Sequence, residues 1–542
     1  MSTHPYEEPT APAQAPSLND KLLFWACFAS IVATAFGFIV RSQIVGEWAR
    51  EYGLGETQVG KINGVGLWPF AISIVIFSLI IDKIGYGKAM AFAFICHISS
   101  AILTILTPRI VGDNHGQAYN LLYFSTFILA LGNGTVEAVA NPVVANLFPR
   151  EKTKYLNMLH AGWPGGLVLG GIIALLMGNS VPWQYKVGLI FLPVLTYAAL
   201  MIGRRFPISE RVTAGVSFNA MLREVGVIGA ALILGLIVRQ LGDVFPISQD
   251  ATTNNVAQLV VWAALVLFYG YQVGFTPGQP MFIILMLIMI PLATTELGTD
   301  SWITPLMEPE MSRIGLSGGW VLVYTSLIML ILRFFAGPIV HRLSPLGLLC
   351  MSSLIAAAGL IFLSRSTGLT ILAAATLYGL GKSFFWPTML GVAAEQFPRG
   401  GALTLNTLGG LGMLAVGVLG APFQGFIQDT KVDRDLAAKD KSVYEQVIQA
   451  PKESVFGEYR SVDLKKVEAL PEAAKADVTT IQDAAKRNVL VTTAIFPCIM
   501  LVCYLGLVGY FRARGGYKPQ IIISEKEEAL LMTGGAQGPA DY

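Results

Sequence analysis

Long runs of apolar residues recur along the whole chain and restrict the folds that it can adopt. Examples are the segments 22–40, 121–131, 281–292 and 489–510. Several approach the roughly 20 residues that a helix needs to cross a bilayer, and the shorter ones reach that length with polar or Gly-containing flanks. The chain is 54% hydrophobic and 13% charged, about half the charged fraction of soluble domains. We therefore predict an all-α, polytopic membrane protein.

A faint internal repeat predicts that the helices form two similar halves. Three short motifs recur 249 positions later and in the same order: Leu131-Gly132 as Leu380-Gly381, Phe148-Pro149-Arg150 as Phe397-Pro398-Arg399, and Leu156-Asn157 as Leu405-Asn406. Chance does not readily produce such a match, because Pro and Asn are uncommon in apolar sequence. Two copies of one helical unit in a membrane are a common construction of secondary transporters.

The expected domain order follows from this repeat. We predict two pseudo-symmetric six-helix bundles at 21–203 and 280–511, joined by a central connection at 204–279. The expected helices lie near 21–42, 60–82, 88–107, 118–147, 154–178 and 184–203, and then near 280–303, 319–340, 346–364, 369–397, 401–427 and 488–511. Apolar runs at 224–242 and 256–275 predict an extra helix pair in the connection. One extra crossing would invert the second half against the first, whereas zero or two extra crossings would keep the halves parallel. We expect two, giving about fourteen transmembrane helices.

Charged residues predict the orientation. Lys and Arg gather in alternate connections, which places both termini in the cytoplasm by the positive-inside rule. Residues 1–20 and 512–542 are then cytoplasmic tails, the first of them Pro- and Ala-rich and disordered. The densely charged segment 429–487 becomes an extracytoplasmic insert with amphipathic patches. We expect a location in a bacterial inner membrane or a plasma membrane.

Composition argues against several function classes. The net charge of +2 argues against nucleic acid as a partner. The five Cys lie in apolar runs without metal-ligand spacing, and no soluble catalytic module is visible. We therefore expect a monomer in the lipid bilayer that is not an enzyme and that binds no metal and no cofactor.

Polar residues inside a predicted membrane helix indicate function, because burying them in lipid is costly. Asn133, Glu137 and Asn141 follow one another at a spacing of four, which places them along one helix face. A low-dielectric site favours the neutral form of a carboxyl, so Glu137 can gain or lose a proton as its surroundings change. We predict that all three residues bind substrate and that Glu137 couples transport to protons. A hydrogen-bonded structural role is the alternative for Glu137.

The second half supplies matching candidates. By the 249-residue offset, Lys382 aligns with Asn133 and Trp386 with Glu137, so an indole would face the carboxylate. The face of an indole can stack on a sugar ring, and we assign both Lys382 and Trp386 to the substrate site. The alternatives are core packing for Trp386 and a gate-closing ion pair for Lys382.

Further substrate-binding candidates lie within the predicted helices: Glu296, Trp302, Asn157, His160 and Asn406. Glu296 is also the second candidate for proton coupling. Asn157 and His160 share one helix face, and Asn406 is the repeat partner of Asn157. For Arg333 we expect a structural charge that pairs with an acid or a helix carbonyl. Arg41 is expected near the outer mouth.

Two connections resemble the cytoplasmic loop motif of the major facilitator superfamily. The copy after the second helix contains Asp82, Lys83, Gly85 and Lys88, with Ser78 where Gly is usual. A weaker copy after the equivalent helix of the second half ends in Arg342, with His341 in place of the usual acid. The resemblance implies that these residues form conformational gating loops.

The helix at 118–147 resembles the fourth helix of fucose permease-type sugar:proton symporters from Gly132 to Pro142. The segments containing Glu296, Trp302 and Arg333 extend this resemblance to the second half. It implies a central cavity lined by the first, fourth, seventh and tenth core helices, with Glu137 binding substrate or proton. Those symporters carry an Asn-Asp pair toward the end of the first helix, where this chain has Arg41-Ser42-Gln43-Ile44. The proton step would then fall to Glu137 or Glu296, or the protein would be a facilitator or carry something other than a sugar.

The sequence therefore predicts a secondary active transporter that moves a small polar solute, most simply a sugar, by alternating access. Coupling to protons would make release depend on the different affinities of the two facing states. Two alternatives stay open. A fourteen-helix proton-driven drug exporter would have an apolar cavity, and an organic or nutrient anion carrier would use Arg41, Arg333 or Lys382 as its ligand clamp.

Overall fold

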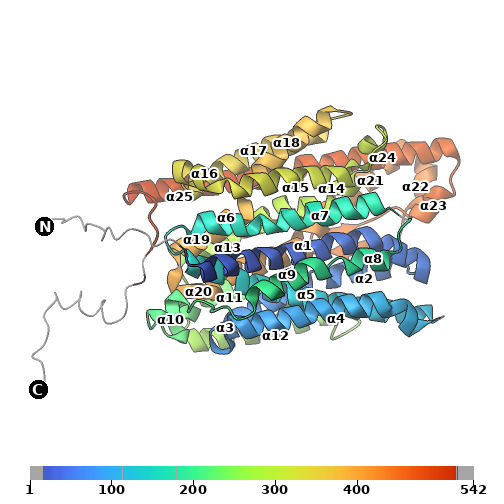
Figure 1. Cartoon of the computed structure of the whole chain (residues 1–542). Coiled ribbons are helices and arrows are strands. Elements are labelled where there is room, and N and C mark those ends of the chain that lie inside the picture. Colours follow the sequence, from blue (N-terminus) through green and yellow to red (C-terminus); the bar gives the residue numbers. More distant parts are fainter. Residues whose placement is uncertain (1–15, 113, 179, 521, 523–542) are drawn as a thin grey trace, which may run out of the picture.

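Helices account for nearly all of the secondary structure in the computed structural model, which describes residues 16–112, 114–178, 180–520 and 522. They run side by side along one elongated bundle (Figure 1). We call the end where α1 begins and α25 ends the terminal end, and the opposite end, which carries α22 and α23, the cap end. Most of both predicted tails lies outside the described residues. The end of the first tail was predicted wrongly as disordered, because Leu18–Asp20 form the first turn of α1, capped by Ser17.

The first half follows the predicted order of helices, with breaks inside three of them. Its elements are α1 (Leu18–Tyr52), α2 (Glu56–Val65), α3 (Trp68–Ile84), α4 (Tyr86–Val111), α5 (His115–Leu147), α6 (Lys152–His160), α7 (Gly162–Met177), α8 (Trp183–Gly188) and α9 (Phe191–Met201). The helical hydrogen bonding is interrupted for one or two residues between α2 and α3, between α6 and α7, and between α8 and α9, and each pair still forms one candidate span, as expected.

A short helix and a long helix pair connect the halves: α10 (Glu210–Thr213), α11 (Phe218–Val244) and α12 (Ala251–Val273). Helix α11 packs on α20 and α13 of the second half. It is also joined to the segment before α13 by backbone hydrogen bonds from Val227 to Thr276 (2.9 Å) and from Ile228 to Pro277 (3.2 Å). Gly226 permits this junction with its left-handed φ of 62°. Both α11 and α12 are long and apolar enough to cross a membrane, and their crossing stays a prediction.

The second half repeats the plan of the first. Its elements are α13 (Pro280–Ala293), the π-helix η1 (Thr294–Gly298), α14 (Thr299–Ser312), α15 (Gly319–Phe334), α16 (Ala336–Leu343), α17 (Pro345–Arg365), α18 (Thr370–Lys382), α19 (Phe385–Gln396), the 3₁₀ turn η2 (Pro398–Gly400), α20 (Gly401–Ala415), the π-helix η3 (Val416–Gly420), α21 (Ala421–Lys439), α24 (Glu472–Thr493) and α25 (Ile495–Ala513). Helices α15 and α16 meet at an angle of 69°.

The predicted insert forms a small cap on the second half. It contains α22 (Lys441–Val447), the antiparallel strands β1 (Lys452–Ser454) and β2 (Gly457–Tyr459), and α23 (Leu464–Glu468). The cap is shorter than the predicted 429–487, because α21 continues to Lys439 and α24 begins at Glu472. Val432, Val447 and Val478 belong to a separate small hydrophobic core that joins these helices to the cap.

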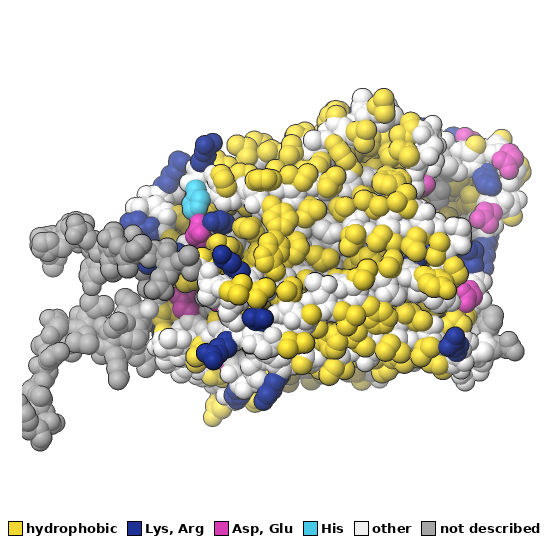
Figure 2. Space-filling model, in the orientation of Figure 1, with side chains coloured by type: hydrophobic (Ala, Val, Ile, Leu, Met, Phe, Trp, Pro, Cys, Tyr) yellow, Lys and Arg dark blue, Asp and Glu magenta, His cyan; other side chains and the backbone are white. Residues whose placement is uncertain are grey.

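Within the described residues, twelve helices are long and apolar enough to cross a membrane, or thirteen if the bent pair α15 and α16 counts as one span. Helices α18 and α19 occupy the predicted helix 369–397 as two shorter pieces. Figure 2 shows hydrophobic side chains covering the middle of one face, while charged side chains gather toward the two ends. This surface is the one expected of a multi-pass membrane protein.

The internal repeat is visible in the backbone. Phe148 ends α5 with φ −127° and ψ 62°, and its repeat partner Phe397 ends α19 with φ −129° and ψ 51°. The two halves meet where α3 packs on α20 and where α7 packs on α15. Small residues allow the close approach, because a Cβ added to Gly410 would lie 2.9 Å from a methyl group of Val75.

Candidate functional site

Glu296 lies at the centre of the second half with both carboxylate oxygens bonded. It belongs to the π-helix η1 and is 1% exposed. Nη2 of Arg333 donates to Oε1 at 2.6 Å, and the backbone N–H of Trp386 donates to Oε2 at 3.0 Å. Wider π turns frequently occur at functional sites. Glu296 thus joins three core helices of the second half.

Arg333 bonds to two backbone carbonyls as well as to Glu296. Its Nη1 donates to the carbonyl of His160 at 2.8 Å, and its Nε to that of Ser383 at 2.6 Å. Each carbonyl lies four residues before a proline, Pro164 and Pro387. A proline has no N–H, so the helix cannot bond these carbonyls and the guanidinium can do so. Arg333 was predicted to pair with an acid or with a helix carbonyl, and it does both. Its bond to the carbonyl of His160 joins the second half to the first.

Glu137 lies on the opposite side of this centre and has different partners. It is 6% exposed, and Nδ2 of Asn141 donates to its Oε2 at 2.8 Å. Nε2 of His160 lies 2.8 Å from Oδ1 of Asn141 and 3.9 Å from Oε2 of Glu137. Within the described part of the chain, no Lys or Arg lies within ion-pair distance of Glu137, and His160 is a counter-charge only when it is protonated. Glu137 is therefore a buried carboxyl without a Lys or Arg partner.

A small cavity separates the two carboxyl groups. Its volume is about 20 Å³, and residues of both halves line it: Phe70, Ile74, Glu137, His160, Trp163, Glu296, Leu297, Arg333, Trp386 and Met413. The repeat thus correctly predicted that Glu137 and Trp386 face one space. Roughly 10–15 Å³ holds one water molecule, whereas ligand pockets measure about 300–1,000 Å³. In this conformation the space between the carboxyl groups is too small for an organic solute.

Lys382 and Asp300 form a second buried ion pair beside this site. Lys382 is 0% and Asp300 9% exposed, and Nζ of Lys382 donates to Oδ1 of Asp300. The ammonium also lies 5.2 Å from the ring centre of Tyr378. Lys382 does not line the central cavity. The pair joins α18 to α14 within the second half. The alternative for Lys382 was an ion pair that closes a gate, and that role stays a prediction.

The remaining predicted residues lie around the centre. Oδ1 of Asn133 pairs with Nε2 of His97 at 2.9 Å inside the first half, away from the cavity. Asn157 donates to Oγ1 of Thr388 across the halves at 3.2 Å. Asn406 donates to the carbonyl of Ala138 at 3.0 Å, again a carbonyl that a proline four residues later, Pro142, leaves unbonded. The side chain of Trp302 lies outside the described residues.

The predicted gating loops lie at the terminal end. Asp82 forms an ion pair with Arg211 of α10, and Gly85 has a left-handed φ of 83° where α3 ends and α4 begins. Lys83 lies 5.7 Å from the ring centre of Phe218. Lys88 and Arg342 are exposed.

A set of contacts that sequence reasoning missed closes the halves at the terminal end. The N–H and hydroxyl of Thr153, in the first turn of α6, donate to Oε1 of Glu395 at 3.1 and 2.5 Å. The hydroxyl of Tyr517 donates to Oε2 of the same carboxylate at 2.8 Å. Burial and the nearby Glu395 carboxylate raise the pKa of Tyr517, so its hydroxyl stays a donor. One signal was available, since Glu395 stands just before the repeated Phe-Pro-Arg motif.

The family of the chain follows from a comparison with family models. The model of the Major Facilitator Superfamily matches residues 23–421. The chain belongs to the major facilitator superfamily. It is therefore a membrane transporter, and the observed arrangement of two helical halves around a central cavity agrees with this family.

Solved structures show the same fold at low sequence identity. A variant of the E. coli fucose:proton symporter FucP is 15% identical, with a TM-score of 0.53 over 89% of this chain and 98% of that one. The E. coli proton:xylose symporter XylE, bound to 6-bromo-6-deoxy-D-glucose, is 13% identical, with a TM-score of 0.56 over 89% and 96%. The human organic anion transporter MFSD10 is 13% identical, with a TM-score of 0.53 over 91% and 100%.

One curated relative matches over part of its length. The TsgA homolog of Buchnera aphidicola is 23% identical over 201 residues, which cover 36% of this chain and 49% of that protein. The match thus spans about half of the relative. The substrate of this major facilitator protein is therefore a matter for proposal.

Proposed function

We propose that this transporter carries a small polar solute, most simply a sugar, by alternating access and couples its movement to a proton at Glu137. One observation carries the proposal. Two buried carboxyl groups face a single cavity between the halves, and only Glu296 has an Arg or Lys as its counter-charge.

This difference supports different roles for the two acids, with Glu137 rather than Glu296 binding the transported proton. Protonating Glu296 would break its 2.6 Å ion pair with the buried Arg333, which leaves an uncompensated cation. Protonating Glu137 breaks no ion pair with Lys or Arg, and its neighbour Asn141 can bond either form. A site whose proton affinity differs between two facing states converts a proton gradient into solute movement.

The chemistry of the cavity supports a polar, hydroxylated solute. Trp163 and Trp386 offer aromatic faces, and Glu137 and His160 offer hydrogen-bonding groups. Six of the ten lining residues are apolar and four are ionisable, so the lining is not the wholly apolar one expected of a drug exporter. Arg333 and Lys382 each pair with a carboxylate, so neither is available as an anion clamp in this conformation.

In the proposed orientation, the protein lies in a cell membrane and its terminal end faces the cytoplasm. Glu395 and Thr153 then hold the cytoplasmic ends of the halves together. Because the cavity of about 20 Å³ holds little more than a water molecule, solute can enter only after the halves separate. The described conformation is thus a closed intermediate of the transport cycle.

Uptake into proteoliposomes tests this proposal. With an inward proton gradient, we expect accumulation of a radiolabelled sugar from a panel that contains fucose, xylose and glucose. The Glu137→Gln variant should lose gradient-driven accumulation and keep solute exchange. The control is Glu453→Gln, which changes an exposed carboxylate in the cap and should transport like the wild type.

Two results would contradict different parts of the proposal. Full accumulation by Glu137→Gln would remove this residue from the coupling step. Accumulation of an organic anion, with none of the sugars taken up, would overturn the substrate class while leaving the coupling test intact.

A further inference from the structure

Arg41 differs from every other buried cation in the described part of the chain. The buried Lys and Arg residues are Arg41, Lys152, Lys186, Arg211, Arg333 and Lys382. All except Arg41 form an ion pair with a carboxylate. Arg41 is 5% exposed, and its Nε is buried without a hydrogen-bond partner. Its guanidinium lies 5.4 Å from the ring centre of Phe38, which supplies no negative charge.

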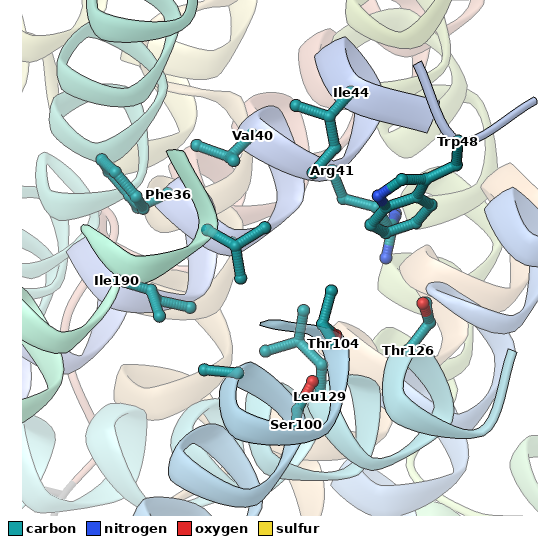
Figure 3. A pocket seen from close by; sticks show the side chains of 13 residues that line it. Phe36, Val40, Arg41, Ile44, Trp48, Ser100, Thr104, Thr126, Leu129 and Ile190 are labelled. Atoms are coloured by element: carbon teal, nitrogen blue, oxygen red, sulfur yellow. The ribbon is translucent and has the colours of Figure 1, made fainter. Parts of the chain in front are cut away.

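The guanidinium of Arg41 reaches into a cavity of the first half. This cavity has a volume of about 40 Å³ and lies between α1, α4, α5 and α8, apart from the cavity at Glu137. Arg41 and Trp48 both line this space, and Figure 3 shows Thr104 and Thr126 below them in the view. The Nε1–H of Trp48 is likewise buried without a partner.

Most of the residues around this space are apolar, and its few polar residues include no negatively charged acceptor among the described residues. Arg and Trp side chains can only donate hydrogen bonds. The hydroxyl of Thr104 donates to Oγ of Ser125 at 2.9 Å, and that of Thr126 to the carbonyl of Leu122 at 2.7 Å. Their protons are thus used, while Arg41 and Trp48 still have N–H groups to donate.

An arginine does not lose its proton in a protein, and a buried charge without a counter-charge is strongly unfavourable. A volume of about 40 Å³ exceeds the roughly 10–15 Å³ of one water molecule and is far below that of an organic ligand pocket. We propose that Arg41 and Trp48 bind a small inorganic anion of the size of chloride. The site lies within the first half, and the inference does not depend on proton coupling at Glu137.

Bromide serves as the probe, because its anomalous scattering identifies it in a crystal. In crystals of the full-length wild-type protein grown with sodium bromide, we expect an anomalous peak beside the Arg41 guanidinium. In detergent, replacing gluconate by bromide at constant ionic strength should raise the melting temperature along a saturable curve. The absence of both the peak and a saturable rise would overturn the proposal.

Two variants connect the response to Arg41. Arg41→Gln removes the charge and should abolish the saturable rise, whereas Arg50→Gln, an exposed change on the same helix, should keep it. If Arg41→Gln does not fold, Arg41→Lys keeps the charge and loses the planar fork, and its apparent bromide affinity should fall about tenfold or more. A response that stays unchanged in either Arg41 variant would show that the halide binds elsewhere, and the proposal would fail.

Discussion

Removing the Arg333 guanidinium tests the idea that one side chain stabilises the centre of the protein. Arg333→Gln breaks a buried ion pair and two hydrogen bonds to carbonyls that prolines leave unbonded. Breaking a buried pair from one side costs about 3–5 kcal/mol, because a charge is left without its partner. That loss corresponds to a factor of roughly 10²–10⁴ in the folding equilibrium.

The double variant Arg333→Gln with Glu296→Gln separates the lone charge from the lost hydrogen bonds. With both charges gone, the remaining loss is that of the two unsatisfied carbonyls, about 1–3 kcal/mol for each. Arg333→Gln alone has the same loss and also leaves the Glu296 charge unpaired, so we expect the double variant to be more stable than Arg333→Gln, by about 3–5 kcal/mol. Equilibrium unfolding in detergent micelles, followed by tryptophan fluorescence, measures both free energies. A double variant as unstable as the sum of its two single variants would refute this account of the site.

Two further predictions concern helix packing. Asn406→Ala leaves the carbonyl of Ala138 without its donor and should lower the free energy of unfolding by about 1 kcal/mol. Adding Pro142→Ala should recover this loss, because residue 142 then has an N–H that can donate to the Ala138 carbonyl within α5. Equal stabilities of the single and double variants would contradict this explanation. Gly134→Ala should lower the free energy of unfolding by about 1–3 kcal/mol in the same assay, because the new Cβ would lie 2.1 Å from the carbonyl oxygen of Phe70. The control is Gly46→Ala, whose Cβ would have nothing within 4 Å and which should leave the stability unchanged or raise it slightly.

The repeat made part of the central site predictable. The offset between the halves placed Trp386 opposite Glu137, and both line the central cavity. Asn133 turned out differently, because a spacing of four residues rotates each side chain by about 40° along the helix surface. Asn133 and Asn141 therefore turn to opposite sides of Glu137, so that Asn133 contacts His97 of α4 while Asn141 contacts His160 of α6 as well as Glu137.

The partners of the buried charges were harder to predict. The π-helix η1 lies just before Asp300 and changes the direction in which this side chain points. A regular helical period of 3.6 residues therefore could not predict that Asp300 pairs with Lys382. The carbonyls that accept hydrogen bonds from Arg333 could be predicted as acceptors only by considering each proline together with the residue four positions before it. Contacts such as that of Thr153 with Glu395 depend on which ends of the halves meet, and this is a tertiary property.

The connection between the halves has a consequence for how far they can separate. Asp82 and Asn19 hold Arg211 and Arg205 of the linking segment against the first half, whereas α11 packs on α13 and α20 of the second half. The chain passes from the first set of contacts to the second at the few residues around Gly215, whose φ is 75°, so a hinge between the halves would lie there. A site-specific protease that cut the chain near Gly215 would leave each half intact and remove the covalent connection that limits how far the halves can separate.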